Sequence, residues 1–287
     1  MAVSGGVDSV VLLDLLLNSK HQDLDTEFIV AHFDHGIRED SKADADFVKN
    51  LATKHKLVFE LGQGNLGADA SEALAREKRY EFLKSVQSKH KATAIITAHH
   101  QDDLIETSII NLLRGTGRRG LTSLKSDSQI TRPLLKFSKI ELIKYAKDHK
   151  LNWHEDSTNT DLKYLRNYVR TKVVAKMTSQ QRDKWLVILA KLEVINGKID
   201  YEIQKILGLG LHKNQLVLNR KWFIMLPHDV SKEIILAILS KSKVAEIDRK
   251  TVERLAVQIK TLQGGKIAQA AGVDIYLTKR SARFKIR

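Results

Sequence analysis

The sequence predicts an α/β fold: a parallel sheet covered by helices on both faces, then a long connecting helix and a small α+β domain. Short, almost continuously apolar segments alternate with helical segments through the first 150 residues. Such segments are typical of parallel strands that are buried on both faces. The chain has 287 residues, 43% hydrophobic and 29% charged, and no apolar run in it reaches membrane-spanning length.

The elements of the N-terminal half can be placed in order. Strands are expected at 1–3, 27–33, 57–61 and 94–98, and helices at 9–18, 41–55, 71–90 and 102–113. Ser41 opens the second helix with Asp44 three residues later, which is similar to a capping box. A loop rich in Arg and Gly is expected next, at 114–136, and its last part, 130–135, should be extended. Two helices are expected after it, at 138–149 and 165–174.

The C-terminal half begins with helical apolar spacing from 179 to about 207, which predicts a long connector. Short helices at 231–240 and 249–260 then mix with strands at 215–218, 267–269, 274–277 and 283–286. We therefore expect three parts: a domain over 1–178, a helical connector over 179–208, and a basic α+β domain over 209–287.

Charge is distributed unevenly along the chain. Residues 1–109 carry 12 Lys/Arg against 18 Asp/Glu, residues 110–175 carry 14 against 6, and residues 176–287 carry 22 against 10. The basic second half favours a nucleic-acid partner over a merely solvated surface. Cysteine is absent, which excludes disulfides, thiolate metal sites and thiol chemistry. We expect a cytoplasmic protein that uses no membrane and has no signal peptide.

The segment Ser-Gly-Gly-Val-Asp-Ser lies between the first strand and the first helix, at residues 4–9. Gly5 and Gly6 let the backbone approach an anion, and amides at the helix N-terminus point at it. Ser4 and Ser9 add hydroxyl donors, and Asp8 can hold a cation that screens a phosphate. It is not a Walker A loop, because no Gly-Lys-Ser/Thr occurs at the required spacing. An ordinary turn is the alternative, but the complete hexapeptide at this junction predicts a polyphosphate-binding loop.

Two more polar clusters follow strands, at 32–38 and 99–103. Ligands of open α/β sheets bind beyond the carboxyl ends of the strands, so we expect these clusters to meet the glycine loop. Asp102 and Asp103 suit magnesium bridging to phosphate oxygens, and His99 and His100 suit phosphate contact or proton transfer. The alternative is a helix N-terminus that favours acidic residues because of its dipole.

Arginines recur near these clusters. Arg76 and Arg79 lie at helical spacing from Glu72, so either ion pairs within the helix or contacts to substrate phosphates explain them equally well. The segment 114–120 combines three arginines with glycines, which favours wrapping of phosphates over a merely solvated loop. Arg166, Asn167 and Arg170 form one helix face near Trp153 and Tyr164, a pattern that suits RNA bases, although Trp153 equally fits a core.

Together these motifs resemble the N-type ATP pyrophosphatase (PP-loop) superfamily, of which Ser-Gly-Gly-Val-Asp-Ser is the signature. Within it they resemble the tRNA(Ile)-lysidine synthase family. The further matching segments are 32–38, 99–107, 114–117, 132–135, 155–159 and 166–167. The resemblance is strong from residue 3 to about 175 and less specific in the tail, and longer members carry a second C-terminal domain. It implies a Rossmann-like fold of the adenine-nucleotide alpha-hydrolase type, with a catalytic PP-loop domain over 1–178 and a tRNA-binding domain over 209–287.

The reaction that this resemblance implies is an ATP-dependent ligation. ATP adenylates the wobble cytidine of a CAU-anticodon tRNA(Ile) and releases pyrophosphate. The amine of free L-lysine then displaces AMP to form lysidine, so that the codon read changes from AUG to AUA. ATP and Mg²⁺ are the implied cofactors.

The implied site residues fall into four groups. The catalytic group is Asp8, Asp34, His99, Asp102, Asp103 and Arg114. The nucleotide-binding group is Ser4, Gly5, Gly6, Val7, Asp8, Ser9, His32 and Arg114. The magnesium ligands are Asp8, Asp102 and Asp103. The substrate- and RNA-binding group is Arg76, Arg79, Glu106, Arg118, Arg119, Arg132, Arg166, Asn167 and Arg170.

Other function classes share the glycine loop. Ammonia-using ligases of small molecules, and a non-catalytic RNA-binding module, stay open as alternatives. Thiolating tRNA enzymes relay sulfur through cysteines or an iron–sulfur cluster, which the absence of cysteine argues against. Asp34, Asp103 and Glu106 are candidates for binding the lysine amine or accepting its proton. The oligomeric state is open, with a homodimer as one option.

Overall fold

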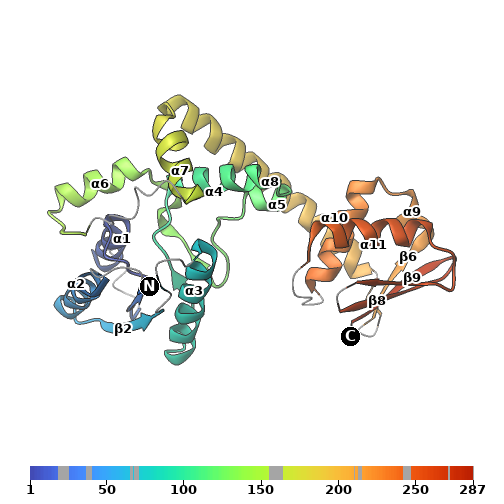
Figure 1. The fold of residues 1–287 in the computed structure, drawn as a ribbon, viewed down its shortest axis with the longest axis horizontal. Helices are drawn as coiled ribbons and strands as arrows, with labels where there is room; N and C mark the ends of the chain where they lie inside the picture. The colour runs from blue at the N-terminus through green and yellow to red at the C-terminus, as the bar shows by residue number, and fades with distance from the viewer. Residues whose placement is uncertain are drawn as a thin grey trace. The chain divides into compact units, whose positions relative to one another are not determined.

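The computed structural model describes residues 1–18, 26–36, 41–64, 67, 71–154, 164–209, 211–212, 215–241, 247–270 and 272–286. Contacts divide the chain into two compact units, Met1–Glu193 and Val194–Arg287 (Figure 1). The motif at 155–159, and residues 37–38 of the second cluster, lie outside the described residues.

Unit 1 is built on a parallel sheet. Strand β1 (Ile29–Asp34) pairs in parallel with β2 (Val58–Gln63), and β3 (Ile95–Ile96) pairs in parallel with β4 (Ile130–Thr131). The extended residues 1–3 join the two pairs: Ala31 N donates to Met1 O at 2.8 Å, and Ala2 N donates to Ile96 O at 2.8 Å. The glycine loop therefore leaves the middle of the sheet, and the predicted parallel sheet is confirmed.

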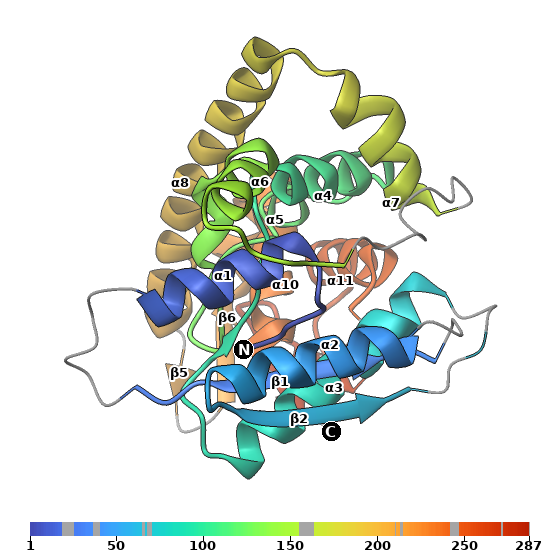
Figure 2. The same ribbon diagram turned by 90° about the vertical axis from the view of Figure 1, so that its left-hand side faces the viewer.

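Helices cover both faces of this sheet because neighbouring strand residues point to opposite sides. On one face α1 (Val7–Asn18) and α2 (Ser41–Lys54) pack around Val30. On the other face α3 (Glu72–Lys89) packs around Ala31. Figure 2 shows α2 and α3 on either side of β1 and β2.

The rest of unit 1 carries shorter elements. They are α4 (Gln101–Leu113), α5 (Arg118–Leu121), a 3₁₀ turn at Pro133–Lys136, α6 (Lys139–Asp148) and α7 (Leu165–Tyr168). Helix α7 continues as a π-helical turn at Val169–Val173 and a 3₁₀ turn at Val174–Lys176. The sequence predicted one regular helix here, and it predicted a loop where α5 stands.

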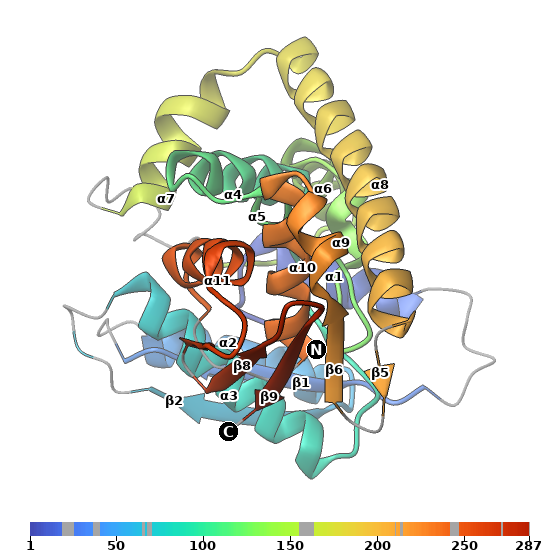
Figure 3. The ribbon, with the colours of Figure 1, turned by 90° about the vertical axis from the view of Figure 1, so that its right-hand side faces the viewer.

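Helix α8 (Ser179–Leu209) is the predicted long helix, and the boundary between the two units falls inside it. Unit 2 then forms a five-stranded sheet in the order β5-β6-β9-β8-β7, and its ladders are antiparallel. The strands are β5 (Leu211–His212), β6 (Gln215–Asn219), β7 (Ile267–Ala270), β8 (Val273–Leu277) and β9 (Ser281–Ile286). Figure 3 shows β6, β9 and β8 side by side.

One face of the unit 2 sheet is covered by helices. They are α9 (Arg220–Met225), α10 (His228–Lys241) and α11 (Arg249–Thr261). Ile234 of α10 and Leu255 of α11 are fully buried against Ile275 and Phe284 of the sheet. The small α+β domain is confirmed, while α9 and β5 were not predicted. Among the described residues, no helix combines the length and apolarity needed to cross a bilayer.

Candidate functional site

The glycine loop is held in one shape by short polar contacts. Gly5 has a φ of 91°, a left-handed conformation that favours glycine. Gly6 N donates to Ser4 Oγ at 3.3 Å, and Ser9 Oγ donates to Gly6 O at 2.9 Å. From a distant segment, His154 N donates to Gly5 O at 3.0 Å. The bend is therefore held by contacts within the loop and by the backbone of a distant segment.

This loop fits an anionic ligand. A Cβ on Gly5 would lie 3.4 Å from Phe47 and Val48 side-chain atoms, in addition to straining the backbone. A Cβ on Gly6 would meet only Ser4 Oγ, at 3.5 Å. Backbone amides at the start of a helix, with two serine hydroxyls, are the donors that phosphate oxygens need. The predicted polyphosphate cradle thus agrees with the local geometry.

Asp8 lies on the first turn of α1, next to the loop. Lys139 Nζ contacts both of its carboxylate oxygens, at 2.7 and 2.8 Å, and His100 Nε2 lies 3.6 Å from Oδ2. Burial alone would raise the pKa of Asp8, but His100 and the Lys139 ammonium hold that pKa below its usual value. An ionised carboxylate beside a phosphate loop is a suitable ligand for Mg²⁺.

The start of α4 places the second acidic residue. His100 N donates to Asp103 Oδ2 at 2.9 Å, and Asp102 N donates to His100 Nδ1 at 3.2 Å, so the two side chains cap the helix. His100 Nε2 is 3.6 Å from Asp103 Oδ2, the same separation that it has from Asp8. Burial opposes ionisation of Asp103, but histidine and arginine charges lower its pKa to about 2.

Asp102 faces a different partner from its neighbour. Its Oδ2 accepts from Arg182 Nη1 at 2.7 Å, and Arg182 Nη2 donates to Val174 O at 2.7 Å. Consecutive helical residues diverge by about 100° around the axis, which separates the two carboxylates. Of the three predicted magnesium ligands, Asp8 and Asp103 therefore flank His100 while Asp102 is engaged elsewhere. No group of three potential metal ligands forms within the part of the chain that the structure describes.

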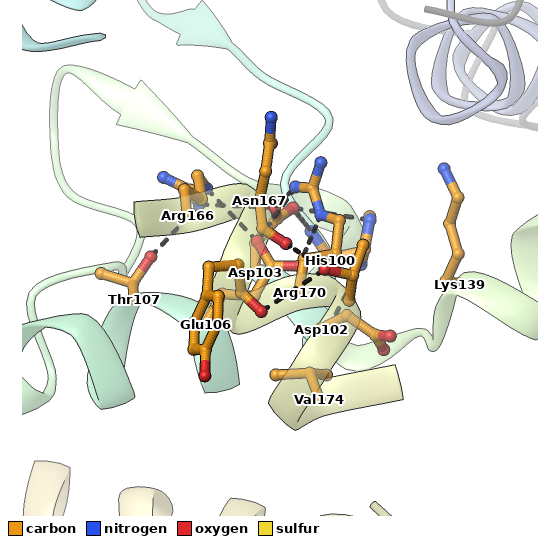
Figure 4. A network of polar contacts seen from close by, with 12 residues as sticks. His100, Asp102, Asp103, Glu106, Thr107, Lys139, Arg166, Asn167, Arg170 and Val174 are labelled. Carbon is orange, nitrogen blue, oxygen red and sulfur yellow. Dashed lines mark hydrogen bonds and ion pairs between the residues drawn. The ribbon is translucent and has the colours of Figure 1, made fainter. Parts of the chain in front are cut away.

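A buried cluster of acids and arginines lies behind Asp103 (Figure 4). Glu106 is only 1% exposed and accepts from Arg170 Nε at 2.7 Å and Nη2 at 2.9 Å. Arg166 Nε donates to Glu106 at 3.3 Å, and Arg166 Nη2 lies 3.5 Å from Asp103 Oδ1. Glu106 is therefore saturated by arginines, whereas Asp103 joins this cluster to His100 and Asp8.

A cavity of about 250 Å³ opens beside this cluster. It is lined by His35, Glu72, Ala75, Arg76, Arg79, His99, Asp103, Arg166 and Arg170. His99 Nδ1 is bonded to Thr97 Oγ1 at 2.8 Å. Burial lowers the pKa of His99 to about 3; the charge of Asp103 opposes this shift, and nearby arginine charges add to it. Four arginines with two acids can recognise a ligand that carries both signs of charge.

Three other predicted site residues, His32, Asp34 and Arg132, form hydrogen bonds outside the acidic cluster. His32 is buried, and its Nδ1 is bonded to Val3 O at 2.9 Å, so it braces the strand that leads into the loop. Asp34 ends β1 and accepts from Gly36 N at 2.8 Å. Arg132 is buried and donates to Lys125 O. The structure thus gives His32 and Arg132 partners inside the fold.

Three predicted arginines stand apart from the acidic cluster. Arg114 is exposed and caps the C-terminal end of α4, about 18 Å along the helix from its first turn. Arg118 and Arg119 lie on α5, which follows that end. Arg114 and Asp103 therefore lie at opposite ends of α4, and the expected catalytic role of Arg114 stays a prediction. Asn167 lies on α7 between Arg166 and Arg170, as predicted for that helix face.

Two functional candidates were missed by sequence reasoning. Lys139 was counted only as part of a helix, and Arg182 only as part of the connector. The capping box of Ser138 and Glu141 signals where α6 begins. No local pattern signals that Lys139 pairs with a residue 131 positions away.

The comparisons with known proteins agree with this geometry. A family model described as the PP-loop domain matches residues 1–177. The tRNA(Ile)-lysidine synthase of Nostoc sp. is 36% identical over 208 residues, covering 70% of this chain and 60% of that protein. The tRNA(Ile)-lysidine synthase of Lactobacillus johnsonii is 41% identical over 182 residues, covering 61% and 42%. The chain therefore spans about half the length of the curated relatives that it matches.

A solved structure shares the fold. The U34-tRNA thiolase NcsA from Methanococcus maripaludis, solved with its [4Fe-4S] cluster, has a TM-score of 0.54 and 19% identity. The match covers 67% of this chain and 71% of that chain. The likeness bears out the Rossmann-like parallel sheet. Because the PP-loop model covers well over half of the residues, and the loop it contains fits an anionic ligand, this chain belongs to the PP-loop family and carries its ATP-binding domain.

Proposed function

We propose that the chain is an ATP-dependent ligase that joins free L-lysine to the wobble cytidine of CAU-anticodon tRNA(Ile), forming lysidine. Relatives that are 36% and 41% identical bear the name tRNA(Ile)-lysidine synthase. The observation that carries the proposal is the bridge from Asp8 through His100 to Asp103. It joins the phosphate loop to a cavity lined by charges of both signs.

In the first half-reaction the cytidine O2 attacks the α-phosphorus of ATP, and the bond to the pyrophosphate oxygen breaks. The loop at 4–9 would hold the leaving pyrophosphate through its amides and the hydroxyls of Ser4 and Ser9. Asp8 would be a ligand of Mg²⁺, which neutralises phosphate charge when bound. The capped start of α4 keeps His100 between the two carboxylates.

In the second half-reaction the lysine amine attacks the activated carbon, and AMP leaves. Before that, the lysine ammonium passes one proton to a carboxylate of the site or to solvent water, and the neutral amine then attacks. Asp103 is ionised and faces the cavity, so we assign it as the counter-ion of that ammonium. Glu106 is engaged by Arg166 and Arg170, which disfavours the same role for it. The cavity arginines are then available for the lysine carboxylate or the adenylate phosphate.

We also propose that the C-terminal part, predicted as 209–287, binds the body of the tRNA through the sheet face opposite its helices. One row across that face is Val217, Arg283, Tyr276 and Ile267, in register on four neighbouring strands. Tyr276 is 39% exposed, and Arg283 and Lys285 of β9 are exposed on the same side. Cations beside an open aromatic ring suit phosphates and unstacked bases.

The test is a ligation assay with the full chain, ATP, labelled lysine and unmodified tRNA(Ile). Label on the RNA together with AMP release is the expected result. A tRNA with the same CAU anticodon on a different body is the matched control, and it should accept much less label. AMP release that needs ammonia and no tRNA would instead indicate a small-molecule ligase. RNA binding without AMP release would indicate a non-catalytic module.

The absence of cysteine suits work in a reducing cytoplasm.

A further inference from the structure

Lys139 is the first residue of α6 and lies beside the glycine loop without belonging to it. Its Nζ lies 2.7 and 2.8 Å from the two oxygens of Asp8. The Lys139 side chain is 35% exposed and that of Asp8 is 27% exposed, so the pair borders solvent. A ligand that enters the loop can therefore reach the ammonium.

The packing of α6 on α1 fixes where this ammonium stands. Leu142 and Ala146 of α6 are buried against Val7 and Val11 of α1. A second polar contact between the two helices lies six residues further along each of them than the contact of Lys139 with Asp8. There Tyr145 OH donates to Asp14 Oδ2 at 2.8 Å. Since both contacts advance in the same direction, the two helices start on the same side. Lys139 is thus held at the end of α1 that points at the loop.

The glycine loop itself contains no cation. In Walker A loops a lysine within the loop reaches the β- and γ-phosphates, and the segment 4–9 has no lysine. We propose that Lys139 supplies this charge from α6. Its ammonium contacts the β- and γ-phosphate oxygens of bound ATP, and it stays with the pyrophosphate when the bond to the α-phosphorus breaks. Asp8 holds the side chain ready until the nucleotide arrives.

A purely structural role explains the pair poorly. Partly exposed ion pairs contribute little to stability, because water screens them and two side chains lose freedom. The two helices are already joined by their apolar side chains and by Tyr145. An ammonium aimed at developing charge, by contrast, acts most strongly on the leaving group. The inference rests on the ATP-binding part of the proposed function and not on transfer of lysine.

The experiment measures binding of ATP, inorganic pyrophosphate and AMP to the full chain by calorimetry, without tRNA or lysine. Lys139→Met should weaken ATP and pyrophosphate binding by roughly tenfold, the effect of one lost charge-assisted contact, and leave AMP within about twofold. Lys139→Arg should keep most of the affinity. Lys144→Met, on an exposed position of the same helix, is the matched control and should change nothing.

Lys139→Met could weaken binding in two ways: by loss of the attraction between the ammonium and the phosphates, or by repulsion from the Asp8 carboxylate that Lys139 no longer neutralises. A second pair of variants separates these two effects. Asp8→Asn with Lys139→Met should bind pyrophosphate more weakly than Asp8→Asn alone. Equal pyrophosphate affinity of these two proteins would overturn the proposal, and so would equal losses of ATP and AMP binding in Lys139→Met. If Lys139→Met does not fold, Lys139→Gln takes its place with the same expected ratio. Because no lysidine is measured, a failed ligation assay leaves this result unaffected.

Discussion

Asp103 combines two tasks in one carboxylate. Oδ2 accepts from the His100 amide as part of the helix cap, while Oδ1 faces Arg166 at 3.5 Å. Truncation to alanine would remove both, so a change of charge alone is the more informative variant. Asp103→Asn can still accept the capping bond but cannot balance an ammonium.

We expect Asp103→Asn to lower lysine-dependent AMP release by at least about a hundredfold, the usual range for a lost charged group in a site. Binding of tRNA, measured by filter retention, should stay within about twofold because the substitution removes no cation that could contact RNA phosphates. An Asp103→Asn protein with full turnover would contradict the assignment.

His99 gives unit 1 a pH dependence. Its pKa is lowered from 6.5 to about 3 in the fold, so the unfolded chain binds the proton more readily between these values. The stabilising effect of a neutral His99 is complete above pH 6.5 and is lost as the pH falls toward 3. Between pH 7.5 and 5 the wild-type free energy of unfolding should fall by about 2 kcal/mol more than that of His99→Asn.

Urea unfolding at the two pH values measures this difference. His55→Asn, at an exposed position, is the control and should follow the wild type. Parallel pH curves for wild type and His99→Asn would show that the imidazole titrates normally.

At the residue scale, sequence reasoning found the side chains that share a local motif and missed those paired across the chain. The loop at 4–9 and Asp103 lie where the pattern placed them. Asp102 and Arg132 have the right chemistry for a site, but their charges meet Arg182 and the Lys125 carbonyl instead. Such partners are set by tertiary packing, which a linear pattern does not contain.

At the scale of elements, Glu106 joins α4 to α7 and to the π-helical turn after it, beside an apolar cluster of Ile105 and Ile109 with Val169. This carboxylate is 1% exposed and receives two bonds from Arg170 and one from Arg166. Removing one partner of a buried ion pair leaves the other charges uncompensated. Glu106→Ala should therefore lower the free energy of unfolding by about 3–5 kcal/mol.

Urea titration checks this, and the m-value should stay unchanged if the unfolding remains two-state. Glu77→Ala on the exposed side of α3 is the matched control, expected within about 0.5 kcal/mol of wild type. A comparable loss of unfolding free energy in Glu106→Ala and Glu77→Ala would mean that the buried ion pairs of Glu106 do not stabilise the fold more than an exposed glutamate does.

Element types were predicted well and their irregularities were not. Apolar periodicity located α3, α6 and α8 to within a residue or two. The same periodicity cannot show that the helix after Leu165 widens into a π-turn at Val169–Val173, because hydrogen-bond shifts leave the composition unchanged. The short helix α5 was not predicted because Gly115, Gly117 and Gly120 within and before it are typical of a loop.

At the scale of the whole molecule, the two units divide the work that we propose. The exposed sheet face of unit 2 should supply part of the salt dependence of tRNA binding. Replacing Arg283 and Lys285 together by glutamine removes two cations there and should lower the slope of log K against log salt by about 2.

The control for that double variant is Arg249→Gln with Lys250→Gln, at exposed positions on α11. It has the same charge change on the helical side of unit 2. If both double variants reduce the slope equally, the RNA is attracted by net charge and not by the sheet face.

The parallel sheet of unit 1 was predictable because its strands are short apolar runs in the sequence, followed by polar residues where the strands end. The division of the whole chain was harder. The continuous apolar spacing of α8 identifies one helix, but it does not show that the unit boundary falls between Glu193 and Val194. Strand register in unit 2, which puts Arg283 beside Tyr276, was likewise invisible to a pattern read along one strand at a time.

The bond from the His154 amide to the Gly5 carbonyl ties two stretches of chain that are almost 150 residues apart. The His154 ring also stacks on Phe47 and bonds to Asp44, both on α2. The glycine loop, α2 and the segment that holds His154 therefore meet at one point. The shape of the bend at Gly5 therefore depends on side chains that the glycine loop does not contain. A substitution of Asp44 or His154 should alter phosphate binding without touching residues 4–9.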